Sequence, residues 1–172
     1  MRLFTLVLLL SSLMASSFAQ SDFSVTVHPF TVDGFDGVQS FVSATYDGHI
    51  LIIGGRKEGL HQRQPFASFL ASGNNTTIHL LHPATGGHWS ANVDALPEPL
   101  QEQLQATNMQ FHQVGDQLVI TGGYGYSPSM NDHLTYAMLT VVDVPALANA
   151  LLNDGDIAPA FRYVPDFRMA VT

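Results

Sequence analysis

The residues most able to carry chemistry are eight histidines, because imidazole binds metals and exchanges protons near neutral pH. None of them has the dense spacing of a metal motif such as His-Glu-x-x-His. His79 and His82 are three positions apart, so on a strand their side chains would face opposite sides. We therefore expect no metal site and no cofactor, with the histidines on strand surfaces and in turns. They are His28, His49, His61, His79, His82, His88, His112 and His133.

Basic and aromatic residues follow two glycine pairs, Gly54-Gly55 and Gly122-Gly123. Functional residues concentrate on loops held by a rigid scaffold, so the loops after both pairs could form one binding face. There, arginine would pair with carboxylates and tyrosine would stack on a sugar. This predicts a site for a carbohydrate or an acidic ligand, and ordinary solvated loop charge is the alternative. The candidate residues in these loops are Arg56, Lys57, Arg63, Tyr124 and Tyr126. Arg168 is the sixth candidate, because it stands at the entry to the next predicted first strand, which in a four-stranded antiparallel unit opens on the same face.

Motifs for catalysis are absent from the sequence, so the catalytic residues are unknown. There is no Gly-x-Ser-x-Gly elbow, no P-loop and no dinucleotide fingerprint. The glycine-rich stretch 122–125 is not followed by a predicted helix that could bind phosphate. A Ser-His-Asp arrangement stays open, because such residues meet only in space. Asn74 and Asn75 each begin a formal N-glycosylation sequon.

The first 19 residues predict a secretory signal peptide, with Arg2, an apolar stretch over 3–10 and the small residues Ser17 and Ala19 around the cleavage site. A signal anchor or a buried strand are the alternatives, although the apolar stretch is too short to span a bilayer. Residues 20–172 would then form one secreted or periplasmic domain, of bacterial type. Without cysteine it has no disulfides, and its net charge of −8 argues against nucleic acid and anionic membranes as partners.

The glycine pairs belong to a repeat, because each ends a short apolar stretch that predicts a buried strand. The two pairs lie 68 positions apart, from 54 to 122. Glycine there would let the backbone turn sharply or approach a neighbour closely. Around the repeat the pattern predicts an all-β chain in two four-stranded units. The first unit covers about 39–96, with strands at 40–46, 50–55, 76–82 and 88–93, and a helical turn is expected after it at 100–105. The second covers about 106–164, with strands at 108–114, 118–123, 134–143 and 160–164, a loop at 124–133 and a helix at 145–152. A leading strand is expected at 24–30 and the start of a third unit at 168–172.

This plan resembles the kelch repeat of β-propellers. The similarity is carried by the two apolar stretches with glycine pairs, by residues 78–85 followed by Trp89, and by Asp143 and Pro145. It implies a partial propeller of two blades, and an antiparallel sandwich with two similar hairpins is the alternative. A propeller needs about four to eight blades. We therefore expect an N-terminal fragment whose partners are the remaining blades of a longer chain, with a ring of several short chains as the alternative.

The resemblance implies a role in binding, for a carbohydrate or a protein partner. A sugar-acid epimerase or mutarotase on the same scaffold is the alternative, with catalytic residues partly outside this sequence. A copper oxidase of the galactose oxidase kind needs a cysteine crosslinked to tyrosine, and this sequence has no cysteine.

Overall fold

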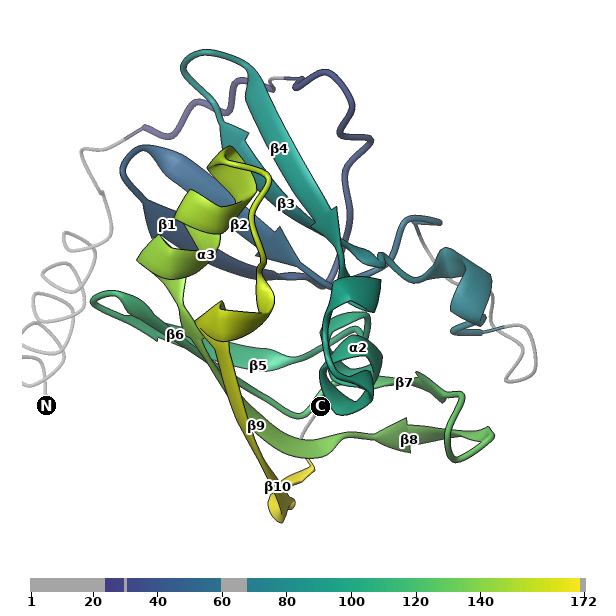
Figure 1. Ribbon diagram of the computed structural model, residues 1–172. Helices are drawn as coiled ribbons and strands as arrows, with labels where there is room; N and C mark the ends of the chain where they lie inside the picture. The colour runs from purple at the N-terminus through teal and green to yellow at the C-terminus, as the bar shows by residue number, and fades with distance from the viewer. Residues whose placement is uncertain (1–23, 30, 60–67, 171–172) are drawn as a thin grey trace, which may run out of the picture.

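The computed structural model of the protein describes residues 24–29, 31–59 and 68–170. They form two four-stranded antiparallel sheets, a two-stranded hairpin and two α-helices (Figure 1). This confirms the all-β class that the sequence predicts. Within the described residues the sheets close into neither a barrel nor a ring, and none of the described helices has the length and apolar character needed to cross a membrane. The predicted signal peptide, 1–19, lies outside the described residues.

The first sheet is a simple meander in the order β1-β2-β3-β4. Its four predicted strands are confirmed to within two residues at each end. The turn between β1 and β2 is formed by Asp47 and Gly48, which have φ angles of 45° and 76°. Two consecutive positive φ angles are typical of the tight hairpin turn that an Asp-Gly pair favours. The strands are β1 (Val42–Tyr46), β2 (His49–Ile53), β3 (Thr77–His82) and β4 (Gly87–Asn92).

The second sheet repeats this meander in the order β5-β6-β9-β10. Strands β7 and β8 are missing from this order because they form a separate hairpin, which stands in the chain between the second and third strands of the sheet (Figure 1). The sheet strands are β5 (Gln110–Val114), β6 (Gln117–Thr121), β9 (Ala137–Asp143) and β10 (Phe161–Ala170). The hairpin strands are β7 (Tyr124–Ser127) and β8 (Asp132–Thr135).

The hairpin corrects two predictions for the second unit. Residues 124–133 are not a loop, and the strand predicted over 134–143 is divided between β8 and β9 around Tyr136. β7 has no continuous apolar stretch, so the pattern did not indicate a strand. It is ordered by four cross-strand pairs with β8, from Tyr124–Thr135 to Ser127–Asp132. Pairing of this kind depends on a partner strand, which local sequence does not report.

Two further strand predictions, at the ends of the chain, are wrong. Residues 24–29 form no strand and are exposed, because no neighbouring strand pairs with them. Their alternation of polar and apolar residues was compatible with a strand, but a strand needs a partner for its backbone groups. At the other end, 168–170 do not start a third unit. They continue β10, where Ala170 pairs with Ala137 after a shift in register. Residues 30, 171 and 172 lie outside the described residues.

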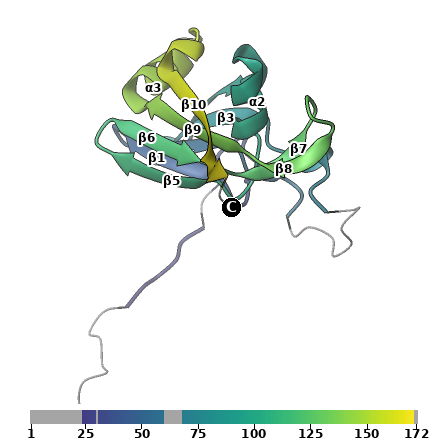
Figure 2. The same ribbon diagram turned by 90° about the horizontal axis from the view of Figure 1, so that it is seen from below.

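The helices fill the space between the sheets. The helix predicted over 145–152 is confirmed as α3 (Val144–Leu152), which begins where the Asp143 side chain accepts a hydrogen bond from the Ala146 backbone N–H. The helical turn predicted over 100–105 is α2 (Glu98–Leu104), with a proline in its first turn. Both helices lie on the same side of the second sheet (Figure 2). Short 3₁₀ helices occur at Ala71–Gly73, Val93–Ala95 and Ala158–Ala160.

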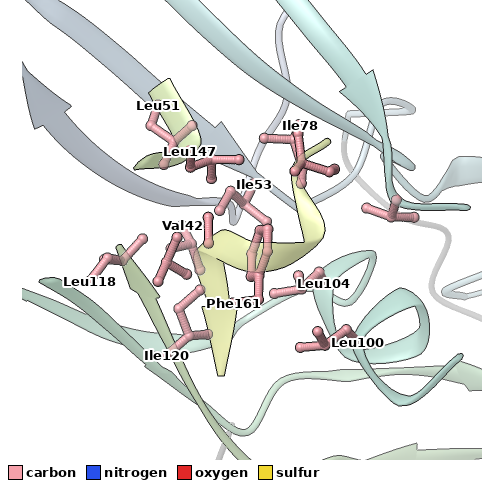
Figure 3. Close-up of a cluster of buried hydrophobic side chains, with 14 of the residues drawn as sticks. Val42, Leu51, Ile53, Ile78, Leu100, Leu104, Leu118, Ile120, Leu147 and Phe161 are labelled. Carbon is pink, nitrogen blue, oxygen red and sulfur yellow. The ribbon is translucent and has the colours of Figure 1, made fainter. Parts of the chain in front are cut away.

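One main core joins both sheets and both helices. Period-2 alternation turns Leu51 and Ile53 of β2 and Leu118 and Ile120 of β6 into this core, with Val42 of β1 between the two pairs and Leu147 of α3 beside Leu51 (Figure 3). A smaller cluster covers the outer face of the first sheet, where Val32 packs on Ile52 and Leu81. The outer face of the second sheet has no such cover among the described residues, and Val114 and Val164 there are 62% and 59% exposed. The two sheets therefore pack as neighbours, with their first strands, β1 and β5, side by side and with side chains of both sheets in one core.

Candidate functional site

The glycine pairs stand where the second strand of each sheet leaves the core. All four glycines have positive φ angles between 67° and 98°, a region that disfavours other residues. At Gly55 a Cβ atom would also lie 2.4 Å from the Gln39 carbonyl oxygen, and at Gly123 it would lie 2.5 Å from Cγ of Met109. The Gly55 N–H donates to the Ala106 carbonyl oxygen at 2.9 Å, which ties the first sheet to the segment that begins the second unit.

The chain segments that follow the two pairs meet in space. Phe69, from the first segment, has its ring centroid 5.2 Å from that of Tyr124 in an edge-on arrangement. Its carbonyl oxygen lies 3.1 Å from Nε2 of His133. His133 stacks on Tyr124 at 6.0 Å and contacts Tyr126 edge-on at 5.4 Å. We call these four residues the aromatic cluster, and each of them is half-buried.

Arg56 stands behind this cluster and is not available to a ligand. Its side chain is nearly fully buried and forms an ion pair with Glu58. Its guanidinium donates to Oδ1 of Asn74 at 2.9 Å and to the Leu70 carbonyl at 2.8 Å. The guanidinium carbon lies 5.4 Å from the centre of the Phe69 ring. Arg56 therefore holds the segment that carries Phe69, whereas the sequence suggested that it faces the ligand.

The other predicted basic residues do not gather around the cluster. Lys57 is exposed and lines a cavity of about 90 Å³ together with Phe35 and His79. Arg168 is exposed on β10, where it forms a 2.5 Å ion pair with Asp166. This pairing lowers the pKa of the Asp166 carboxyl, chiefly through the side-chain hydrogen bond. Arg63 lies outside the described residues. Of the six candidates, the structure therefore brings together Tyr124 and Tyr126, with Arg56 as support.

Two histidines of the first sheet form a pair that the sequence did not indicate. His79 on β3 and His88 on β4 stack, with Nδ1 of His79 3.0 Å from Nε2 of His88. Phe35 closes over His79 with ring centroids 5.0 Å apart. Burial, and then the charges of His88 and Lys57, lower the pKa of His79 to about 4. His79 is therefore neutral at pH 7 and belongs to the packing of this face.

Metal binding has no support in the described part of the chain, where no group of three or more histidine, aspartate and glutamate side chains is close enough to hold an ion. His49 and His82 approach each other edge-on at 4.6 Å, with Trp89 beside His49.

The sequon residues Asn74 and Asn75 are only 4% and 1% exposed. The Asn75 side-chain amide donates to the Gly54 and Thr77 carbonyl oxygens. The folded protein therefore does not present either sequon for glycosylation.

A larger cavity lies on the other face of the β7–β8 hairpin, and no sequence motif marks it. Its volume is about 450 Å³ and it contains the buried carboxylate of Glu102. The only hint is that Glu98 and Glu102 are four positions apart, which places them on one face of a helix. Its lining is Glu98, Pro99, Glu102, Ser127, Ser129, Met130, Leu134, Tyr136, Ala137, Met138 and Pro165. We call it the α2 pocket.

Tyr136 connects the α2 pocket to the hairpin. Its hydroxyl donates to the Tyr126 backbone carbonyl at 3.1 Å. Burial, together with the negative charge of Glu102, raises the pKa of the Tyr136 hydroxyl well above its usual range. Tyr136 therefore stays protonated at physiological pH and acts as a hydrogen-bond donor that fixes β7.

No protein-family model matches the chain, and neither does any curated protein.

Proposed function

We propose that this protein is an exported, kelch-type propeller segment that acts as a binding module, and that the aromatic cluster binds carbohydrate. The observation that carries the proposal is the meeting of Phe69, Tyr124, Tyr126 and His133 after the two glycine pairs. Half-buried rings held by a rigid scaffold suit stacking on the apolar face of a sugar ring.

The kelch-type assignment is supported by the repeat in three dimensions. Both sheets are four-stranded antiparallel meanders, and in both the second strand is followed by a glycine pair. β1 and β5, the first strands, lie side by side, and the Gln113 side chain bonds both the N–H and the carbonyl of Thr45. A ring of this kind needs about four to eight such sheets. The uncovered outer face of the second sheet, with Val114 and Val164, would be covered by a further sheet.

The test is carbohydrate binding by the whole protein and by matched tyrosine variants. A glycan array would identify the ligand class, and titration calorimetry would then compare Tyr126→Ala and Tyr124→Ala with wild type. We expect each variant to lose about fivefold in affinity, because one aromatic contact is worth roughly 1 kcal/mol. Tyr163→Ala is the control, since Tyr163 is an exposed tyrosine on β10 outside the cluster. Absence of glycan binding by wild type, or equal binding by Tyr126→Ala, would refute the proposal.

An epimerase on the same scaffold would need an acid–base pair open to its substrate. Among the described histidines and tyrosines, His79 and Tyr136 have the most strongly shifted pKa values. Both side chains are hydrogen-bonded to other groups of the protein. His79 is paired with His88, and the Tyr136 hydroxyl donates to a backbone carbonyl. No specific observation favours the enzyme, so we propose binding alone.

A further inference from the structure

The β7–β8 hairpin has two faces, and the α2 pocket lies on the face opposite to the aromatic cluster. Tyr126 pairs with His133 across the hairpin, and both belong to the cluster. Ser127 and Leu134, the next residues along each strand, point to the other side because strand side chains alternate. Both of these line the α2 pocket. The pocket is therefore separate from the surface that we propose for carbohydrate.

The pocket contains a carboxylate that the fold keeps out of water. Glu102 is only 8% exposed. Its Oε2 accepts a hydrogen bond from the Ser127 hydroxyl at 2.6 Å, and its Oε1 accepts one from the Ser129 backbone N–H at 2.9 Å. A carboxylate offers about four acceptor positions. The two bonds orient Glu102 and leave acceptor capacity for a further donor in the pocket.

The negative charge of Glu102 has no cationic partner within the described residues. The ion pairs found there join Arg56 to Glu58 and Arg168 to Asp166. Among the side chains that line the pocket there is no lysine, arginine or histidine, and a second carboxylate, Glu98, stands at its exposed rim. A buried charge is costly unless it is paired, so the pocket favours a cation.

The rest of the lining is apolar and of a size that suits a small organic molecule. Pro99, Leu134, Met138 and Pro165 form the walls, and Met130 at the hairpin turn is 68% exposed at the opening. Methionine adapts to ligands of varied shape because its side chain is flexible and polarizable. A volume of about 450 Å³ lies within the range of small-molecule sites.

We propose that the α2 pocket binds an organic cation, an ammonium group carried on an apolar chain or ring. The ammonium group donates to the free acceptor positions of Glu102, and the apolar part packs against Leu134, Met138 and Met130. Charge complementarity with Glu102 supplies the specificity, and the apolar walls exclude water from the ion pair.

The experiment uses the whole protein and three probes of similar shape: phenethylammonium, phenethyl alcohol and phenylacetate. Binding is measured by calorimetry and by NMR of the Leu134 and Met130 methyl groups, at low and high salt. We expect the ammonium probe to bind at least tenfold more tightly than the alcohol, and the carboxylate probe not to bind. Saturable binding with no preference for the cation, or no binding of the ammonium probe at 10 mM (about the weakest affinity such a site would have), would overturn the proposal.

Variants separate the pocket from its surroundings. Glu102→Gln keeps the shape and removes the charge, so affinity for the ammonium probe should fall at least tenfold, while Glu98→Gln at the exposed rim should change it less than about threefold. Should Glu102→Gln fail to fold, Leu134→Trp fills the pocket from the half-exposed side of the hairpin and should abolish binding. Tyr126→Ala, on the opposite face, should leave ammonium binding unchanged, so this site and the carbohydrate surface can fail independently. Unchanged binding in both Glu102→Gln and Leu134→Trp would place the probe elsewhere and overturn the proposal.

Discussion

Gln103 holds α2 on the second sheet, and we predict that Gln103→Leu costs about 3 kcal/mol of unfolding free energy. The side chain is fully buried. Its Nε2 donates to the carbonyl oxygens of Gly122 at 3.2 Å and Met138 at 3.0 Å, and its Oε1 accepts from the Thr140 hydroxyl at 2.6 Å. Leucine has a similar size but makes none of these bonds.

The magnitude follows from which groups lose their partner. The Met138 carbonyl still accepts from the Gly122 N–H at 3.2 Å, so it stays bonded. The Thr140 hydroxyl and the Gly122 carbonyl lose a bond in a dry site, at about 1 to 3 kcal/mol each. Leucine in place of glutamine returns about 1 to 2 kcal/mol, because two further carbon groups are buried at roughly 0.8 kcal/mol each. A net loss of about 3 kcal/mol is a large part of the roughly 5 to 15 kcal/mol that stabilises a domain.

Urea denaturation followed by circular dichroism measures this loss, with Gln110→Leu on β5 as an exposed control that should change stability by less than about 0.5 kcal/mol. A double-mutant cycle that combines Gln103→Leu with Thr140→Val measures the coupling energy between these two side chains. We expect a coupling energy of about 1 kcal/mol or more, because the second substitution removes a hydroxyl that the first has left unpaired. Strict additivity, or a loss no larger than that of Gln110→Leu, would show that the network does not hold α2 in place.

Two further predictions concern the first sheet. Because the fold lowers the pKa of His79 to about 4, the unfolded chain takes up this proton first, near pH 6.5, and stability should fall as the pH drops from 6.5 to about 4. Urea midpoints across this range should show a flatter pH dependence in His79→Gln than in wild type or in His112→Gln, an exposed control; parallel curves would contradict the lowered pKa. Gly55→Ala should cost about 3 kcal/mol or more, because its φ of 87° disfavours alanine and its Cβ would meet the Gln39 carbonyl oxygen at 2.4 Å. Gly115→Ala, with φ of 56° and open space around its Cβ, should cost about 1 kcal/mol, and equal losses at the two sites in thermal denaturation would count against the clash.

The strands of both sheets could be predicted because their signals are local. The Asp47-Gly48 turn forces a hairpin whatever surrounds it, and alternation shows which residues of β2 can be buried. Helix α3 could also be predicted, since Asp143 and Pro145 mark its start. The prediction of a leading strand at 24–30 was wrong although it used the same alternation of polar and apolar residues. Alternation shows that a segment can pair as a strand, but it does not show that a partner strand is present.

Less of the candidate sites than of the fold could be predicted from the sequence. Tyr124 and Tyr126 were identified from their types and from their position after a glycine pair. Arg56 was expected at the surface because arginine usually lies there, yet Glu58 and Asn74 pair with it and make its burial possible. No sequence pattern marks Glu102 as a site residue, because the seven-residue helix that carries it contains no known motif.

The amino-acid sequence by itself determined the turns, the apolar faces of the strands and the two places where only glycine fits, since these depend on backbone geometry within a few residues. The tertiary structure decided which polar groups are buried and which loops meet. Phe69 and His133 are 64 positions apart, and Glu102 and Ser127 are 25 apart. Contacts at such separations depend on how the two sheets pack, because the free energy that favours them comes from burying the shared core and not from local preference.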